Sequence, residues 1–199
     1  HIKYITNLQD DKQDLLEPLE ITLQNKITSF DSSKIILTDT NYNPVKGYTI
    51  GIDTALEKVT LSYAWKEAKD FKLLVHKEAF TDSAGNHLPK DDTLSFTTAP
   101  EKEYGSIRLR FANLDLTKNP VLQLVQGGNI VDAIPITGEI YRKLYKPGEY
   151  EMRILYDANK NGVWDAGNYL QKRQPETSVS IPRKLNIKAN WDNEVNVNL

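Results

Sequence analysis

The chain contains no cysteine. This absence excludes disulfides, thiol nucleophiles and cysteine-ligated zinc sites. Long hydrophobic runs are also missing, since the longest apolar stretches are short pieces such as "IIL" and "FKLLV". A membrane-spanning helix needs about 18 consecutive apolar residues. We therefore expect no membrane span in this fragment.

Recognisable catalytic motifs are missing as well. The sequence has no G-x-S-x-G elbow, H-E-x-x-H helix, G-x-G-x-x-G turn or phosphate-binding loop. Its histidines, His1, His76 and His87, are scattered, and we expect His76 to be a satisfied or half-exposed strand residue rather than a base. We predict that the protein is not an enzyme. An enzyme would need carboxylates from distant turns to meet in a cleft, which a sequence cannot display.

Charge of one sign is not concentrated anywhere. The net charge is −2, with arginine confined to the second half of the chain. This balance predicts no nucleic-acid partner. The first residue is His1 rather than Met, and from this we expect the fragment to come from a longer or processed precursor.

Short strand patterns, separated by Gly, Pro, Asn and Asp turns, dominate the chain. In the first half we expect strands at residues 19–23, 34–39, 47–52, 58–65, 71–80 and 93–98. Between the fourth and fifth of these, the helix-like "AWKEAKDFKLL" is too short for a helix, and we interpret it as a turn. Alternation predicts these core residues: Ile21, Leu23, Val59, Leu61, Tyr63, Leu94 and Phe96.

A polar linker, "TAPEKEYG" at residues 98–105, marks a domain boundary. Beyond it we expect strands at residues 106–111, 121–126, 129–136, 139–145, 149–157, 178–182, 184–191 and 194–199. We find no motif repeated at a fixed period between the halves. The sequence therefore predicts an all-β protein of two β-sandwich domains, residues 1–100 and residues 104–199.

Residues 80–98, "FTDSAGNHLPKDDTLSFTT", form an acidic turn between two strands. Gly85 and Asn86 suit a sharp reversal, and Asp82 can accept hydrogen bonds from turn amides. The stretch resembles the closing hairpin of bacterial Ig-like domains of the S-layer type. This resemblance covers about residues 1–99 and implies an Ig-like sandwich.

In the second half, "LYKPGEYEMRILYD" at residues 144–157 feeds a strand from a Pro-Gly turn. It resembles prealbumin-like, carboxypeptidase-regulatory and collagen-adhesin B-type modules. As a whole, with "GNYLQKRQPE" and "KANWDNE", the chain resembles the C-terminal part of Ig-like-domain lipoproteins of Bacteroidota. That resemblance implies a cell-envelope location, outer-membrane-associated or at the cell surface, with a lipid anchor possible in the precursor.

Residues 156–168, "YDANKNGVWDAGN", alternate acidic and amide side chains around a glycine. The spacing matches the first part of an EF-hand calcium loop, and it is similar to loops of dockerins and of staphylococcal serine-aspartate-repeat adhesins. The candidate ligands are Asp157, Asn159, Asn161, the Val163 carbonyl and Asp165. The bidentate glutamate of an EF-hand is replaced by Asn168, so any affinity for Ca²⁺ is expected in the range of about 10⁻⁴ to 10⁻³ M.

An alternative for the same loop is a chain of Asx-turns, with Trp164 packed beneath it and no required cofactor. Trp164 and Tyr169, with Arg173 nearby, are also candidates for an exposed binding surface. Our leading hypothesis is a non-enzymatic structural or interaction module of a larger envelope lipoprotein, with an unknown protein or glycan partner. The alternative is a carbohydrate-binding module that uses the exposed aromatic side chains.

Overall fold

The computed structural model describes all residues from His1 to Leu199, and it confirms the prediction of an all-β chain. The chain divides into two compact units, His1–Glu101 and Lys102–Leu199. Its only helical segments are four 3-10 turns: η1 (Ser32–Lys34), η2 (Lys77–Ala79), η3 (Glu101–Glu103) and η4 (Leu116–Lys118). None of its helical segments is long and apolar enough to cross a membrane.

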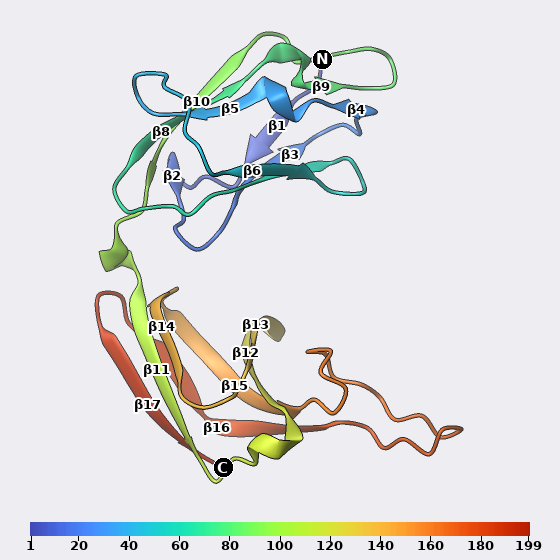
Figure 1. Cartoon of the computed structure of the whole chain (residues 1–199), viewed down its shortest axis with the longest axis vertical. Coiled ribbons are helices and arrows are strands. Elements are labelled where there is room, and N and C mark those ends of the chain that lie inside the picture. The colour runs from blue at the N-terminus through green and yellow to red at the C-terminus, as the bar shows by residue number, and fades with distance from the viewer. The chain divides into compact units, whose positions relative to one another are not determined.

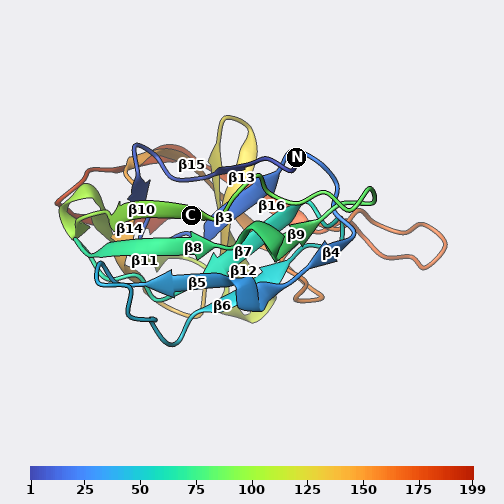
Figure 2. The ribbon, with the colours of Figure 1, turned by 90° about the horizontal axis from the view of Figure 1, so that it is seen from above.

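The first unit is a sandwich of two four-stranded sheets (Figure 1). One sheet has the order β1 (Tyr4–Thr6), β3 (Leu19–Leu23), β7 (Lys58–Ser62), β6 (Thr49–Ile52). The other has the order β2 (Lys12–Gln13), β10 (Asp92–Thr98), β8 (Asp70–Val75), β5 (Ile35–Thr38), of which β5, β8 and β10 lie side by side in Figure 2. A small ribbon pairs β4 (Ser29–Phe30) with β9 (Phe80–Thr81).

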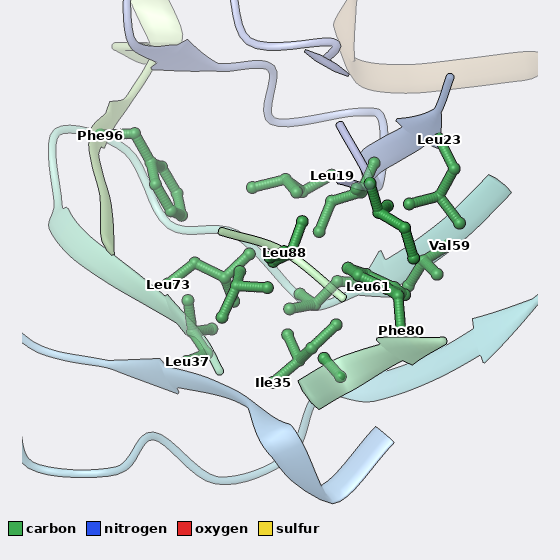
Figure 3. Packing of buried hydrophobic residues seen from close by; sticks show 14 of the residues in the cluster. Leu19, Leu23, Ile35, Leu37, Val59, Leu61, Leu73, Phe80, Leu88 and Phe96 are labelled. Atoms are coloured by element: carbon green, nitrogen blue, oxygen red, sulfur yellow. The ribbon is translucent and has the colours of Figure 1, made fainter. Parts of the chain in front are cut away.

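Alternating burial builds the core of this unit. In β3, "LEITL", the three apolar side chains are buried and the two polar ones are half-buried, as the two-residue period of a strand requires. Figure 3 shows Leu19 and Leu61 from one sheet facing Leu37 and Leu73 from the other. The predicted core residues belong to this cluster, although Tyr63 and Leu94 are only half-buried against it.

The second unit is also a sandwich. A three-stranded sheet has the order β14 (Ile140–Tyr145), β11 (Gly105–Ala112), β17 (Asp192–Asn198), with β17 parallel to β11. A four-stranded sheet has the order β13 (Asn129–Pro135), β12 (Pro120–Gln126), β15 (Gly148–Tyr156), β16 (Thr177–Ile187). Its core includes Ile107 and Leu109 from the first sheet and Leu122, Leu124 and Ile154 from the second.

Several predicted strands are wrong in extent. The stretch 71–80 is not one strand, because β8 ends at Val75 and η2 follows. His76 is therefore a cap and not a strand residue: its Nδ1 accepts the Glu78 amide at 3.3 Å. A hydrogen bond from the Lys77 amide to Asp91 (2.8 Å) holds this turn.

The predicted break between residues 178–182 and 184–191 is also wrong, since β16 is continuous from Thr177 to Ile187. Pro182 is accommodated because β16 pairs only with β15 and its register shifts between Ile181 and Leu185. A proline lacks the amide hydrogen of a sheet ladder, so an edge strand with an irregular register is where it fits.

Candidate functional site

Residues 157–176 form the candidate site. They connect β15 to β16, which pair directly at Tyr156 and Thr177, so the whole segment is an excursion from a closed hairpin (Figure 1). Connections between adjacent antiparallel strands usually need only about 2–5 residues. The sandwich therefore does not require this loop for its topology, and long loops on a rigid scaffold are common carriers of function.

Asp157 anchors the start of the loop. Its side chain is only 2% exposed, and its Oδ1 and Oδ2 accept the amides of Asn161 (3.2 Å) and Gly162 (2.6 Å). Gly162 has φ +77°, a conformation that glycine adopts without strain. The buried carboxylate thus fixes a tight turn through two backbone donors.

Asn159, Asn161 and Asp165 converge inside the turn. The Nδ2 atoms of both asparagines donate to Asp165 Oδ2, at 2.5 Å from Asn159 and 2.8 Å from Asn161. Their Oδ1 atoms accept backbone amides two residues further along the chain. This is the Asx-turn arrangement, and it satisfies the Asp165 carboxylate with amide donors.

Glu176 closes the loop, and the sequence analysis did not identify it. Its Oε1 accepts the Ala158 amide (2.8 Å) and its Oε2 accepts the Asp165 amide (3.0 Å). The Glu176 amide also donates to the Asp165 carbonyl at 3.0 Å. The only sequence signal was a carboxylate after the Pro175 turn, eight residues beyond the position where an EF-hand places its glutamate.

The donor types of this loop suit Ca²⁺, which prefers carboxylate, amide and carbonyl oxygens. Asp157, Asn159, Asn161 and Asp165 lie in one turn, with the Val163 carbonyl in the same segment. The structure holds no group of three or more His, Asp or Glu side chains that could hold a metal. Ca²⁺ coordination would also require both asparagine side chains to turn their oxygens, rather than their NH₂ groups, toward Asp165.

Beyond the turn, residues 168–173 form a small hairpin. The backbones of Asn168 and Arg173 exchange two hydrogen bonds (2.8 and 2.9 Å), and the Lys172 amide donates to the Tyr169 carbonyl at 3.1 Å. Asn168 Oδ1 also accepts the Gln171 amide at 3.1 Å. Four hydrogen bonds therefore define the tip, whose side chains come from residues 169–172.

The tip exposes large apolar side chains. Tyr169 is 96% and Leu170 is 92% exposed, more than any other large hydrophobic residue of the chain. Trp164 is 49% exposed, and its Nε1 donates to the Glu176 carbonyl at 2.7 Å. The predicted binding residues Trp164, Tyr169 and Arg173 thus share one loop, but no ring contact or side-chain hydrogen bond joins them.

The base of the loop forms one wall of a cavity of about 650 Å³. Pro120, Val121 and Ile136 give it an apolar floor, and Asp157 and Lys160 contribute polar lining. Neither Trp164 nor Tyr169 lines it. The exposed aromatic side chains and the cavity are therefore separate features of the unit.

Outside this loop, the carboxylates whose pKa values are shifted are explained by local hydrogen bonds. Hydrogen bonds from the Asn43 and Asn86 side chains, followed by turn amides, lower the pKa values of Asp39 and Asp82. Asp82 accepts the amides of Ala84 and Asn86 at 2.9 and 2.8 Å, which confirms its expected role in the turn. Asp39 and Asp82 are half-buried turn residues whose carboxylates accept hydrogen bonds from local donors.

Comparisons with known proteins give only distant likenesses. No family model matches the sequence, and no curated protein matches it. The chain is similar to native alpha-2-macroglobulin from Escherichia coli, with 12% identity and a TM-score of 0.41 over 90% of this chain and 69% of that chain.

Two further solved structures are similar to the chain. The N-terminal part of the bacterial S-layer protein SbsC has 10% identity and a TM-score of 0.38 over 84% of this chain and 42% of that chain. The major pilin subunit BcpA of Bacillus cereus has 13% identity and a TM-score of 0.28 over 100% of this chain and 69% of that chain. At these values no activity or partner is carried over, and the site must be interpreted from its own residues.

Proposed function

We propose that the chain is a non-enzymatic interaction module of the cell envelope and that the loop 157–176 is its contact element. The observation that carries this proposal is the pinned hairpin at residues 168–173, with Tyr169 and Leu170 almost completely exposed at its tip. The sandwich beneath it acts as the rigid support.

The composition of the tip has no folding explanation. Turn positions favour Gly, Asn, Asp, Ser and Pro, because these residues stabilise the turn backbone or tolerate solvent. Tyr169 and Leu170 make no contact with the hydrophobic core of the unit. Tyrosine and arginine are also enriched among the residues that dominate protein interfaces. Exposed apolar side chains on a well-defined turn therefore support a role in contacting a partner.

The local geometry supports the same role. Asp157, Glu176 and the Asn168–Arg173 pairing hold the loop through hydrogen bonds that involve the backbone. A contact element that is ordered before binding loses less conformational entropy when the partner binds. We assign the partner class to a protein or a glycan of the envelope, in keeping with the sequence resemblance to envelope lipoproteins.

The test is photo-crosslinking in intact cells of the source organism. A benzophenone amino acid replaces Leu170 in the full-length protein, and a matched control carries it at Ile5, another exposed apolar residue (58%). We expect a discrete adduct from position 170 and none from position 5. Adducts that are equal at the two positions, or missing at position 170, would contradict the proposal.

A second candidate is carbohydrate binding, favoured by two exposed aromatic side chains, Trp164 (49%) and Tyr169 (96%), within one loop. Flat apolar faces of this kind can stack on sugar rings, and Arg173 could donate hydrogen bonds. On a glycan array, Trp164→Ala and Tyr169→Ala should each remove a wild-type signal while circular dichroism stays unchanged. A signal that survives both substitutions would exclude this use of the loop.

We also propose that the turn 157–165 binds Ca²⁺ weakly through Asp157, Asn159, Asn161, Asp165 and the Val163 carbonyl. The clustering of oxygen donors around one turn supports this proposal, and from the low ligand charge we expect a dissociation constant of about 10⁻⁴ to 10⁻³ M. Bound Ca²⁺ would add rigidity at the base of the hairpin rather than catalysis.

A further inference from the structure

Each unit joins the edges of its two sheets by the same pair of residue types. In the first unit, the Tyr4 hydroxyl on β1 donates to Asp92 Oδ2 on β10 at 2.6 Å. In the second unit, the Tyr145 hydroxyl on β14 donates to Asp132 Oδ2 on β13 at 2.9 Å. The partners lie 88 and 13 residues apart in sequence, so the two arrangements are not copies of one local motif.

The second oxygen of each aspartate has the same role in both units. Asp92 Oδ1 accepts the amide of the next residue, Thr93, at 2.8 Å. Asp132 Oδ1 accepts the amide of Ala133 at 2.9 Å. We call each set, Tyr4–Asp92–Thr93 and Tyr145–Asp132–Ala133, a seam clamp.

The amides that the clamps occupy point away from the sheets. On β10, the Thr97 amide donates to Asp11 at 3.0 Å, outside the β8–β10 pairing. Because strand amides alternate in direction with a period of two residues, the Thr93 amide lies on the same outer edge. On the other side, the Ile136 amide donates to the Pro120 carbonyl and so points toward β12. Ala133 lies three residues earlier, an odd spacing, so its amide points in the opposite direction, away from β12.

Both edges lack a neighbouring strand where the clamp lies. β2 pairs with β10 only at Thr97 and Thr98, and β13 pairs only with β12. A groove of about 530 Å³ runs beside the first clamp, with Ile2, Leu88 and Leu94 in its lining. Ile130 and Val131, which precede Asp132, are 52% and 50% exposed. Unpaired strand edges are templates for strand pairing, and at β13 the exposed Ile130 and Val131 add apolar surface beside the edge.

We infer that the two seam clamps keep these edges from pairing with a second copy of the chain. The aspartate carboxylate accepts the outward amide hydrogen that an incoming strand would otherwise bind. Its negative charge at the edge also disfavours the approach of another strand. The tyrosine holds the carboxylate in place by tying it to the opposite sheet. A second copy is the relevant occupant because identical edges form an antiparallel pair about a two-fold axis without any other partner.

The experiment compares Asp92→Ala and Asp132→Ala with wild type by analytical ultracentrifugation of the purified chain. We expect each variant to raise the self-association constant by about tenfold or more, since one outward backbone hydrogen bond becomes available per copy. Hydrogen exchange at the Thr93 or Ala133 amide should accelerate by a similar factor at protein concentrations that keep the variant monomeric.

The matched controls are Asp53→Ala and Asp115→Ala. Each removes an aspartate that caps turn amides away from these edges: Asp53 accepts Glu57 and Lys58, and Asp115 accepts Thr117. They should lose stability without gaining association. If the clamp variants associate no more than these controls, the inference is overturned.

Tyr4→Phe and Tyr145→Phe provide the test if an alanine variant does not fold. Each removes one hydroxyl and leaves the aspartate in place, so we expect faster exchange at Thr93 or Ala133 and association between that of wild type and the alanine variant. Exchange at the wild-type rate in both would also overturn the inference.

Discussion

At the residue scale, aspartate and glutamate act mainly as acceptors for backbone amides. Asp157 and Glu176 each accept two amides and thereby fold the loop on itself. Asp39 and Asp82 hold two turns of the first unit in a related way. Removing such an acceptor leaves amide donors without a protein partner, so the conformation of a whole loop depends on a single carboxylate.

The calcium proposal is tested by thermal melting with Ca²⁺ and, as a control, with Mg²⁺. A ligand that binds only the folded state at tenfold its dissociation constant raises the unfolding free energy by about 1.4 kcal/mol. We expect a rise in Tm of the second unit with millimolar Ca²⁺ and no rise in the Asp165→Ala variant. If the Tm of the wild-type protein does not change with Ca²⁺, the calcium proposal is wrong and the turn is held by hydrogen bonds alone.

Alkaline pH should destabilise the protein through its clamp tyrosines. Burial, followed by the hydrogen bonds to Asp92 and Asp132, raises the pKa values of Tyr4 and Tyr145. Tyrosine in the unfolded chain ionises at about pH 10, so the stabilising contribution of Tyr4 and Tyr145 is complete below that pH and declines above it. Each tyrosine can lower the free energy of unfolding by at most about 1.4 kcal/mol per pH unit. The effect is smaller here because both side chains are partly hydrated.

Urea unfolding at pH 8 and pH 11 measures this effect. The double variant Tyr4→Phe/Tyr145→Phe cannot lose these protons, so its free energy of unfolding should fall less between the two pH values than that of wild type. Equal losses in the two proteins would show that the clamp tyrosines titrate normally.

At the element scale, edges and bulges decide how strands tolerate unusual residues. Pro182 fits β16 only because that strand is an edge with an irregular register. The start of β11 shows the opposite case, a position where nothing larger than glycine fits. Gly105 is buried, and an added Cβ would lie against the Lys188 carbonyl and 2.6 Å from Asn193 Nδ2.

Gly105→Ala should therefore destabilise the second unit by about 1–3 kcal/mol, the usual cost of overpacking. Asn193 cannot move away freely, because its side-chain amide bonds the Ser106 carbonyl (2.9 Å) and its Oδ1 accepts the Lys188 amide (3.0 Å). Chemical denaturation measures the change. Gly138→Ala is the matched control, since its Cβ would meet nothing within 4 Å; equal stabilities for the two variants would contradict the clash.

At the scale of the whole molecule, the chain has two hydrophobic cores that share no residue. The first is built from residues up to Phe96, and the second begins at Ile107. Leu73 and Leu109 are completely buried in the first and second core respectively. Each core therefore offers a position at which one unit can be perturbed from within.

Leu73→Ala and Leu109→Ala should each lower the unfolding free energy of their own unit by about 2–5 kcal/mol, through lost burial and the cavity left behind. Hydrogen exchange, read separately for amides of β3 and of β12, gives the stability of each unit. We expect Leu73→Ala to accelerate exchange in β3 and Leu109→Ala to accelerate it in β12. Uniform acceleration across the chain in either variant would contradict this expectation.

The sequence by itself determined the features that depend on local pattern. Alternating apolar residues in segments such as "LEITL" and "SIRLRF" specify strands, because one side of each must be buried. The polar stretch at 98–105 indicated a boundary, and the structure divides between Glu101 and Lys102. The Asx turns of the 157–165 loop were also foreseeable, since those bonds join residues only a few positions apart.

Only the tertiary structure decided which distant groups meet. Glu176 returns to Ala158 and Asp165 because β16 pairs beside β15, and that pairing depends on packing in the core rather than on neighbouring residues. The Tyr4–Asp92 clamp likewise joins residues 88 positions apart. The local pattern of apolar residues determines which side of a strand is buried. Which strands become its neighbours depends on how all the buried faces pack together in one core.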